Sequence, residues 1–115
     1  MVLDNKVRIF KALSDSNRLR ILKMLQVRSL CVCEITEILG LATSTVSSHL
    51  RILRDAGFIV ELKEGKWVNY MINTHPTDPV LASLNSIMHA LLNDIEDIQR
   101  DRKMVLTVDR MALCR

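Results

Sequence analysis

The sequence has little glycine, few cysteines and no long apolar run. Three glycines in 115 residues leave no glycine-rich phosphate loop, and no set of nucleophile, base and acid is visible, so we do not expect an enzyme. No segment approaches the roughly 20 apolar residues that a membrane-spanning helix needs. Charged Asp4, Lys6 and Arg8 interrupt the N-terminus before a secretory signal could develop, and we therefore expect a soluble, cytoplasmic protein.

The cysteines and the charge each give one indication of function. In a reducing cytoplasm, closely spaced cysteines such as Cys31 and Cys33 are more often metal-binding or redox-active than structural. The net charge is +3, but residues 1–30 carry seven Lys/Arg against two Asp, whereas residues 78–102 carry two Arg against five acidic residues. This asymmetry is compatible with an anionic partner on one side of the molecule.

Residues 31–57 predict two short helices joined by a tight turn, which is the helix-turn-helix pattern. Gly40 and Gly57 are expected to end the two helices, because glycine adopts the left-handed conformation that a helix end requires. The second helix is predicted over about 43–56. Its buried face is predicted from apolar residues at positions i, i+4 and i+7, namely Val46, Leu50 and Leu53.

The opposite face of this second helix is rich in short hydroxyl side chains. Five lie between residues 43 and 48, whereas a helix N-cap needs one. Such a surface can approach a DNA backbone closely and hydrogen-bond phosphates or base edges, which favours a recognition helix. For His49, packing at the DNA face is the alternative to a phosphate contact. The predicted DNA contacts on this helix are Thr43, Ser44, Thr45, Ser47, Ser48, His49 and Arg51.

Two β-prone segments, 58–63 and 66–72, flank a predicted turn at Glu64-Gly65 and indicate a β-hairpin. A hairpin that directly follows a recognition helix is a wing. Lys63 and Lys66 at its tip are predicted to contact phosphate beside the groove. We expect Trp67 and Tyr70 to pack the hairpin onto the helices rather than to stack on bases.

A last helix is predicted over about 79–102, because its apolar residues recur at steps of three and four, as in a pairing helix. A homodimer would read two half-sites of a palindrome, and packing on the domain's own core is the alternative. The predicted dimer interface comprises Leu84, Met88, Leu91, Ile95 and Ile98. The fold class is mainly α with a small β-hairpin, a winged helix-turn-helix domain over 1–102 that dimerises through its terminal helices, followed by a C-terminal tail over 103–115.

In this order the elements resemble the ArsR/SmtB family of bacterial metal-responsive repressors over roughly residues 4–100. The resemblance is carried by LCVCEI at 30–35, STVSSHLRILRDAG at 44–57 and EGKWVNYMI at 64–72. Its Cys-Val-Cys is similar to the metal box of the arsenical-resistance repressors. The resemblance implies a repressor that binds double-stranded operator DNA. Its inducer would be arsenite or antimonite, held by the thiolates of Cys31 and Cys33.

One position departs from the family pattern. The arsenical repressors carry a third cysteine five residues after the first, where this chain has Thr36. Either two thiolates and a small external ligand suffice, or Cys114 folds back as the third metal ligand, and an idle Cys114 is equally open. The family's zinc-type site looks absent, since Ile87 and Arg100 stand where Asp and His would be.

The spacing of the two neighbouring cysteines suggests a switch. Residues at i and i+2 on an ideal helix point about 200° apart, so Cys31 and Cys33 at a helix start could share one ion only if the first turn unwinds. We expect that distortion to misplace the recognition helix and release DNA. The same thiols could instead sense cadmium, lead or oxidation. The alternative from a different functional class is a metal-buffering protein that binds no DNA.

Overall fold

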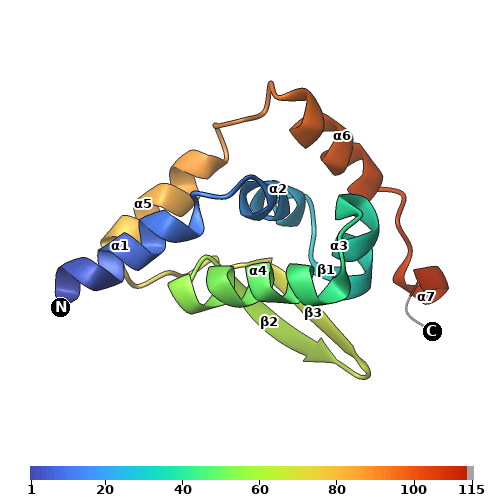
Figure 1. The fold of residues 1–115 in the computed structure, drawn as a ribbon, viewed down its shortest axis with the longest axis horizontal. Coiled ribbons are helices and arrows are strands. Elements are labelled where there is room, and N and C mark those ends of the chain that lie inside the picture. The colour runs from blue at the N-terminus through green and yellow to red at the C-terminus, as the bar shows by residue number, and fades with distance from the viewer. Residues whose placement is uncertain (114–115) are drawn as a thin grey trace.

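The structure, a computed structural model, describes residues 1–113 and is mainly helical with one small antiparallel sheet (Figure 1). None of the helices in this range is both long and apolar enough to cross a membrane. The elements in chain order are α1 (Val2–Ala12), α2 (Ser16–Leu25), β1 (Leu30–Cys31), α3 (Val32–Leu39), α4 (Thr43–Ala56), β2 (Ile59–Glu64), β3 (Trp67–Ile72), α5 (Pro79–Met88), α6 (Glu96–Val105) and α7 (Arg110–Leu113).

The helix-turn-helix prediction is confirmed at α3 and α4. Gly40 and Gly57 end the two helices with φ of 68° and 95°, in the left-handed region that favours glycine. A Cβ at Gly57 would also lie 2.6 Å from a methyl carbon of Leu81, so that side chain of α5 would have to shift to admit any other residue. The buried face of α4 is the predicted one, with fully buried Val46, Leu50 and Leu53.

The predicted hairpin is confirmed, and a third strand joins it. β2 and β3 pair antiparallel with Glu64 opposite Trp67, so the two turn residues are 65 and 66, one position later than predicted. The two-residue strand β1 pairs with the other edge of β3, which places Cys31 opposite Asn69. Helix-turn-helix and three-stranded wing together form the winged helix-turn-helix fold predicted from the sequence.

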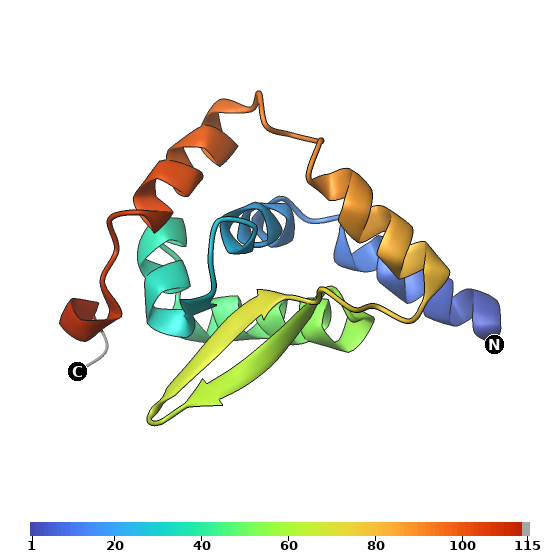
Figure 2. The ribbon, with the colours of Figure 1, turned by 180° about the vertical axis from the view of Figure 1, so that it is seen from behind.

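The prediction of one continuous helix over 79–102 is wrong. α5 ends at Met88 and α6 begins at Glu96, and between them Leu92 has a φ of 67° (Figure 2). The ammonium group of fully buried Lys23 donates a hydrogen bond of 2.7 Å to the carbonyl oxygen of Met88, which satisfies the C-terminal end of α5. The apolar residues that recur every three or four positions over 79–102 therefore lie on two separate helices and the turn between them, and they do not form one continuous apolar stripe.

The break divides the predicted dimer residues between two environments. Met88 and Ile98 are buried within their own chain, and Leu84 packs against its core. Leu91 and Ile95 each expose 43% of their surface. Met88 and Ile98 are thus covered by their own chain, while a dimer contact stays a prediction for Leu84, Leu91 and Ile95.

Helix α6 belongs to the body of the domain and continues past the predicted boundary at 102. Arg20 of α2 holds buried Asp101 through two hydrogen bonds of 2.7 and 2.9 Å. Val105, in the last turn, is fully buried in the main core. The first part of the predicted tail is thus helical and packed.

Helix α1 exposes several of its apolar side chains to solvent. Leu3, Val7 and Phe10 expose 63%, 39% and 54% of their surface, whereas the core contacts come from Ile9 and Ala12. A second feature ties α1 to α5, since Lys6 forms an ion pair with Asp78, the N-cap of α5. Several exposed apolar side chains close together on one helix are typical of a protein interface.

Replacing Lys23 by alanine is expected to lower the free energy of unfolding by about 2–4 kcal/mol, because it removes the donor to a buried helix-terminal carbonyl and leaves a cavity. Chemical denaturation followed by circular dichroism measures the change. Lys103→Ala, at an exposed position of α6, is the matched control and should change stability by less than about 0.5 kcal/mol. Equal stability of the two variants would contradict this role for Lys23.

Candidate DNA-binding surface and thiol site

The solvent-facing side of α4 presents the predicted hydroxyl cluster. Thr43, Ser44, Thr45, Ser47 and Ser48 are all exposed, as is Arg51. The N-cap of α4 is Ala42, so the helix start uses none of these hydroxyls as a cap. Within residues 1–113 none of the five forms a side-chain hydrogen bond or ion pair. Their hydrogen-bonding capacity is therefore available to an external acceptor or donor.

His49 is placed differently from the rest of the predicted contacts. It is half-buried, and its Nδ1 accepts a hydrogen bond of 3.2 Å from Arg18 of α2. Arg18 also donates to the carbonyl oxygen of Ala12 at 2.8 Å, at the end of α1. The geometry gives His49 the packing position that was the alternative to a phosphate contact, where it fixes α4 against the α1–α2 corner.

Asp15 completes this corner as the N-cap of α2. Its carboxylate accepts hydrogen bonds from the backbone N–H groups of Asn17 and Arg18 at 2.8 and 3.1 Å. Burial would raise the pKa of Asp15, but these N–H donors and the charges of Arg18 and His49 outweigh it, so the pKa is lowered. The cap of α2 is therefore linked to the predicted recognition helix through Arg18 and His49.

The wing carries its two predicted lysines at the tip, both exposed. The Lys66 ammonium lies 4.9 Å from the centre of the Trp67 ring, and the guanidinium of Arg110 lies 5.2 Å from the same ring. Trp67, the first residue of β3, therefore lies next to the positively charged groups of Lys66 and Arg110. An ion pair between Arg54 and Glu61 joins α4 to β2 and fixes the wing relative to the helix.

A cleft of about 480 Å³ lies beside the wing and contains both neighbouring cysteines. The side facing them belongs to β3 and to the last turn of α7. Because the two cysteines and Trp67 share one cleft, a ligand held by the thiols would lie against the wing. Its lining residues are Cys31, Val32, Cys33, Lys66, Trp67, Val68 and Leu113.

Cys31 precedes the helix that it was predicted to begin. It is the last residue of β1 and the N-cap of α3, with extended dihedral angles of −88° and 168°. Its backbone N–H donates to the Glu34 carboxylate at 3.0 Å, in a capping box. Cys31 therefore lies outside helical geometry, whereas Cys33 is the second residue of α3, so the separation of about 200° between two residues of one ideal helix does not describe this pair.

The electrostatics around Cys31 disfavour its thiolate. Burial raises the pKa of the Cys31 thiol, the backbone N–H of Glu34 opposes this, and the negative charge of the Glu34 side chain raises it further. Glu34 itself stays ionised, because burial would raise its pKa but a hydrogen bond of 2.8 Å from Arg28 lowers it. The thiol is thus held neutral until a ligand replaces its proton.

The donor set in residues 1–113 comprises two sulfurs. No group of three or more His, Cys, Asp or Glu in this range is arranged to hold a metal ion. The hydroxyl of Thr36, where the family pattern has cysteine, is buried and has no hydrogen-bond partner in the same range. Cys114 lies outside the described residues. The structure has Cys33 disulfide-bonded, so the two sulfurs in this cleft could hold a soft, sulfur-accepting ion in the reduced protein, with the remaining ligand supplied by another donor.

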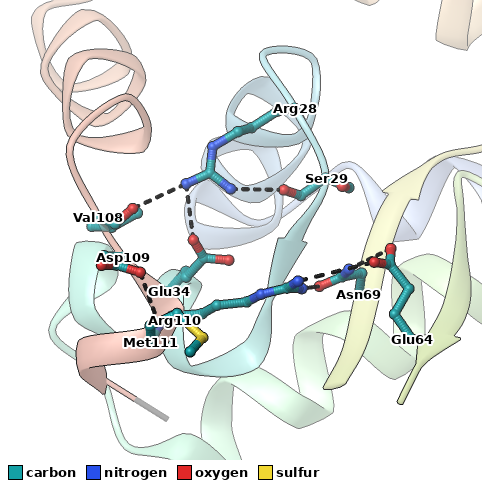
Figure 3. A pocket seen from close by; sticks show the side chains of 9 residues that line it. All are labelled: Arg28, Ser29, Glu34, Glu64, Asn69, Val108, Asp109, Arg110 and Met111. Atoms are coloured by element: carbon teal, nitrogen blue, oxygen red, sulfur yellow. Dashed lines mark hydrogen bonds and ion pairs between the residues drawn. The ribbon is translucent and has the colours of Figure 1, made fainter. Parts of the chain in front are cut away.

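A polar network that was not predicted from the sequence lines a second pocket, between α3, the wing and the C-terminal segment (Figure 3). Arg28 joins Glu34 to the C-terminal segment, and Arg110 of that segment reaches Asn69 of β3 at 3.2 Å. Asn69 in turn donates to Glu64 at 2.7 Å. The bonds that tie the C-terminal segment into this network join residues 41 to 80 positions apart in the chain, and no local pattern could have predicted them.

The sequence matches a family model described as "Bacterial regulatory protein, arsR family" over residues 15–60. The arsenical resistance operon repressor of Escherichia coli is 37% identical over 70 residues, which span 60% of this chain and 60% of that protein. The arsenical resistance operon repressor of Bacillus subtilis is 39% identical over 74 residues, which span 64% of this chain and 70% of that protein.

Solved structures agree with the fold. The homodimeric winged helix-turn-helix DNA-binding domain of a possible ArsR-family transcriptional regulator from Mycobacterium bovis superposes with a TM-score of 0.65 at 28% identity. The superposition covers 77% of this chain and 79% of that one.

Replacing Asp15 by asparagine tests the charge of the α2 N-cap, which lies beside Arg18 and His49. Asparagine caps equally well but lacks the charge, so the wild type should be more stable by about 0.5–1 kcal/mol at pH 7. Because the pKa of Asp15 is lowered in the folded state, this advantage is present above its usual value of about 3.9 and is lost as the pH falls through the folded value. Denaturant titrations of both proteins between pH 7 and pH 2.5 measure it, and a pH-independent gap would contradict the assignment.

Proposed function

Because the chain belongs to the ArsR family of bacterial regulatory proteins, we propose that it is a DNA-binding transcriptional repressor that trivalent arsenic or antimony releases from its operator. The observation that carries the proposal is the cleft in which Cys31 and Cys33 face the wing residue Trp67. This cleft places two cysteine sulfurs, which are ligands for soft ions, next to the wing, the element that would contact DNA. The match spans only 60% of the Escherichia coli repressor, so the activity of the whole protein is part of the proposal.

DNA recognition is assigned to α4 and the wing. The exposed hydroxyls of α4 can hydrogen-bond base edges and phosphates in the major groove, and Arg51 adds a charged contact on the same face. Lys63 and Lys66 at the wing tip are placed to neutralise phosphates beside that groove. His49 serves this surface by holding α4 against α2.

A homodimer would present two such surfaces to a palindromic operator. The surface proposed for dimerisation combines the exposed apolar residues of α1 with those that follow α5. Phe10 and Leu3 expose more than half of their surface, and Leu91 and Ile95 expose 43% each. Burial of apolar area of this kind stabilises association by about 25 cal/mol per Å².

Arsenous acid is the proposed inducer. When As(OH)₃ reacts with two thiols, two As–S bonds form, two As–O bonds break, and the thiol protons leave as two water molecules. The third As–O bond can remain, or a third thiol can replace it. Cys114 is proposed for that role as the third cysteine of the chain.

The proposed switch acts through the sheet. Cys31 is paired with Asn69 of β3, and its N–H is held by Glu34 of α3. An ion that draws the sulfurs of Cys31 and Cys33 together displaces the end of β1, and both the wing and the start of α3 are attached to it. A ligand with different affinity for the two arrangements shifts the balance between the DNA-bound and released forms.

The DNA-binding face is tested by Ser44→Asp. A carboxylate in the first turn of α4 suits the helix dipole but repels phosphate, so folding should be retained and DNA affinity should fall at least tenfold. Fluorescence anisotropy with DNA from upstream of the gene measures the affinity. Thr77→Asp adds the same charge at an exposed loop position and should bind within twofold of wild type. Equal affinities for the two variants would exclude α4 as the recognition helix.

The inducer site is tested by the double variant Cys31→Ser/Cys33→Ser. It should bind the same DNA but remain bound at arsenite concentrations that fully release the wild type, because serine oxygens do not replace soft sulfur ligands. Cys114→Ser is the companion variant, and weaker release by it would assign the third ligand. Normal release of the double variant by arsenite would overturn the proposal.

Parallel titrations identify the class of inducer. Release of the wild type by cadmium or by peroxide, with arsenite and antimonite inactive, would assign the thiols to those signals instead. A wild-type protein that binds arsenite but no DNA would favour the metal-buffering alternative.

A further inference from the structure

We infer that Arg110, in the C-terminal segment, is a positioning residue that sets the wing for its DNA contact. The inference rests on the proposed function, because it takes the wing to touch DNA. It adds a residue and a segment to which no DNA-binding role has been given above.

The segment that carries Arg110 is fixed to the body of the domain. Arg28 donates hydrogen bonds to the carbonyl oxygen of Val105 at 2.9 Å and to that of Val108 at 3.2 Å. The same guanidinium holds buried Glu34 of α3 at 2.8 Å. Arg110 thus starts from a fixed backbone, two residues after the Val108 anchor (Figure 3).

From this anchor, Arg110 crosses to the wing. Its Nη1 donates to Oδ1 of Asn69 at 3.2 Å, and its Nη2 lies 4.0 Å from a carboxylate oxygen of Glu64. Asn69, which is 5% exposed, donates its amide to the other oxygen of Glu64 at 2.7 Å. One guanidinium therefore holds the middle of β3 and, through Asn69, the last residue of β2 before the turn.

Arg110 also acts on the aromatic residue beneath the wing tip. Its guanidinium and the Lys66 ammonium both lie near the ring of Trp67, at 5.2 and 4.9 Å from its centre. Cations are attracted to the face of an indole ring, so the ring position and the Lys66 position depend on each other. Loss of Arg110 would free the ring and with it the lysine that faces the DNA backbone.

The hairpin has little else to fix its tip. Lys63, Glu64, Gly65 and Lys66 are all exposed, whereas the other end of the wing is buried at Ile59. The C-terminal segment and the hairpin tip lie at the same end of the molecule in both views (Figures 1 and 2). Arg110 is thus placed where the hairpin would otherwise move most freely.

The test is the DNA affinity of Arg110→Ala over a series of salt concentrations. If a wing lysine loses its phosphate contact, the affinity should fall about five- to tenfold and the slope of log affinity against log salt should fall by about one. Arg100→Ala removes the same charge at an exposed position of α6 and should leave both quantities unchanged. Equal behaviour of the two variants would overturn the inference.

A double variant separates positioning from direct contact. If Arg110 acts through the wing lysine, Arg110→Ala/Lys66→Ala should bind no more weakly than Lys66→Ala alone. Additive losses would mean that Arg110 reaches DNA by itself, and the positioning role would be wrong. Arg110→Lys keeps the charge without the planar guanidinium, so full recovery of affinity would also overturn it.

A readout without DNA checks the contact itself. Trp67 is the only tryptophan, so its emission should shift in Arg110→Ala while the far-ultraviolet circular dichroism stays unchanged. If Arg110→Ala does not fold, Arg110→Lys carries the same comparison. A wild type that binds no DNA contradicts the proposed function, whereas tight binding by both wild type and Arg110→Ala with unchanged emission overturns this inference alone.

Discussion

The antiparallel pairing of β1 with β3 is the constraint on which the rest of the structure depends. Two residue pairs, Leu30 with Tyr70 and Cys31 with Asn69, join the start of the helix-turn-helix to the wing. Without them the hairpin would be a two-stranded ribbon, which is marginally stable in water. With them, Cys31, which is both the end of β1 and the N-cap of α3, is hydrogen-bonded into the same sheet as the wing, so a shift of Cys31 would move both the wing and the start of α3.

Much of the fold could be predicted because its signals are local. The bounds of α4 follow from Gly57 and from the spacing of Val46, Leu50 and Leu53. Asp15 marks the start of α2 in the same way. The exposed hydroxyl face was predictable too, because on a helix the buried face determines the opposite one.

The errors arose where distant residues decide the structure. The heptad spacing over 79–102 was consistent with one helix, but Lys23 binds the carbonyl of Met88 and the chain turns there. A two-residue strand such as β1 has no alternation to detect, so Cys31 was taken as helical. The ion pair of Arg20 with Asp101 and the hydrogen bond from Arg28 to the carbonyl oxygen of Val105 join residues that local sequence patterns cannot relate.

The division of α4 into two faces has a consequence for how such proteins diversify. Packing of the helix depends on fully buried Val46, Leu50 and Leu53, whereas the hydroxyl face makes no side-chain hydrogen bond within residues 1–113. Substitutions at Ser44 or Ser47 can therefore accumulate with little effect on folding. A single scaffold could thereby acquire new operator sequences while its ligand response is inherited intact.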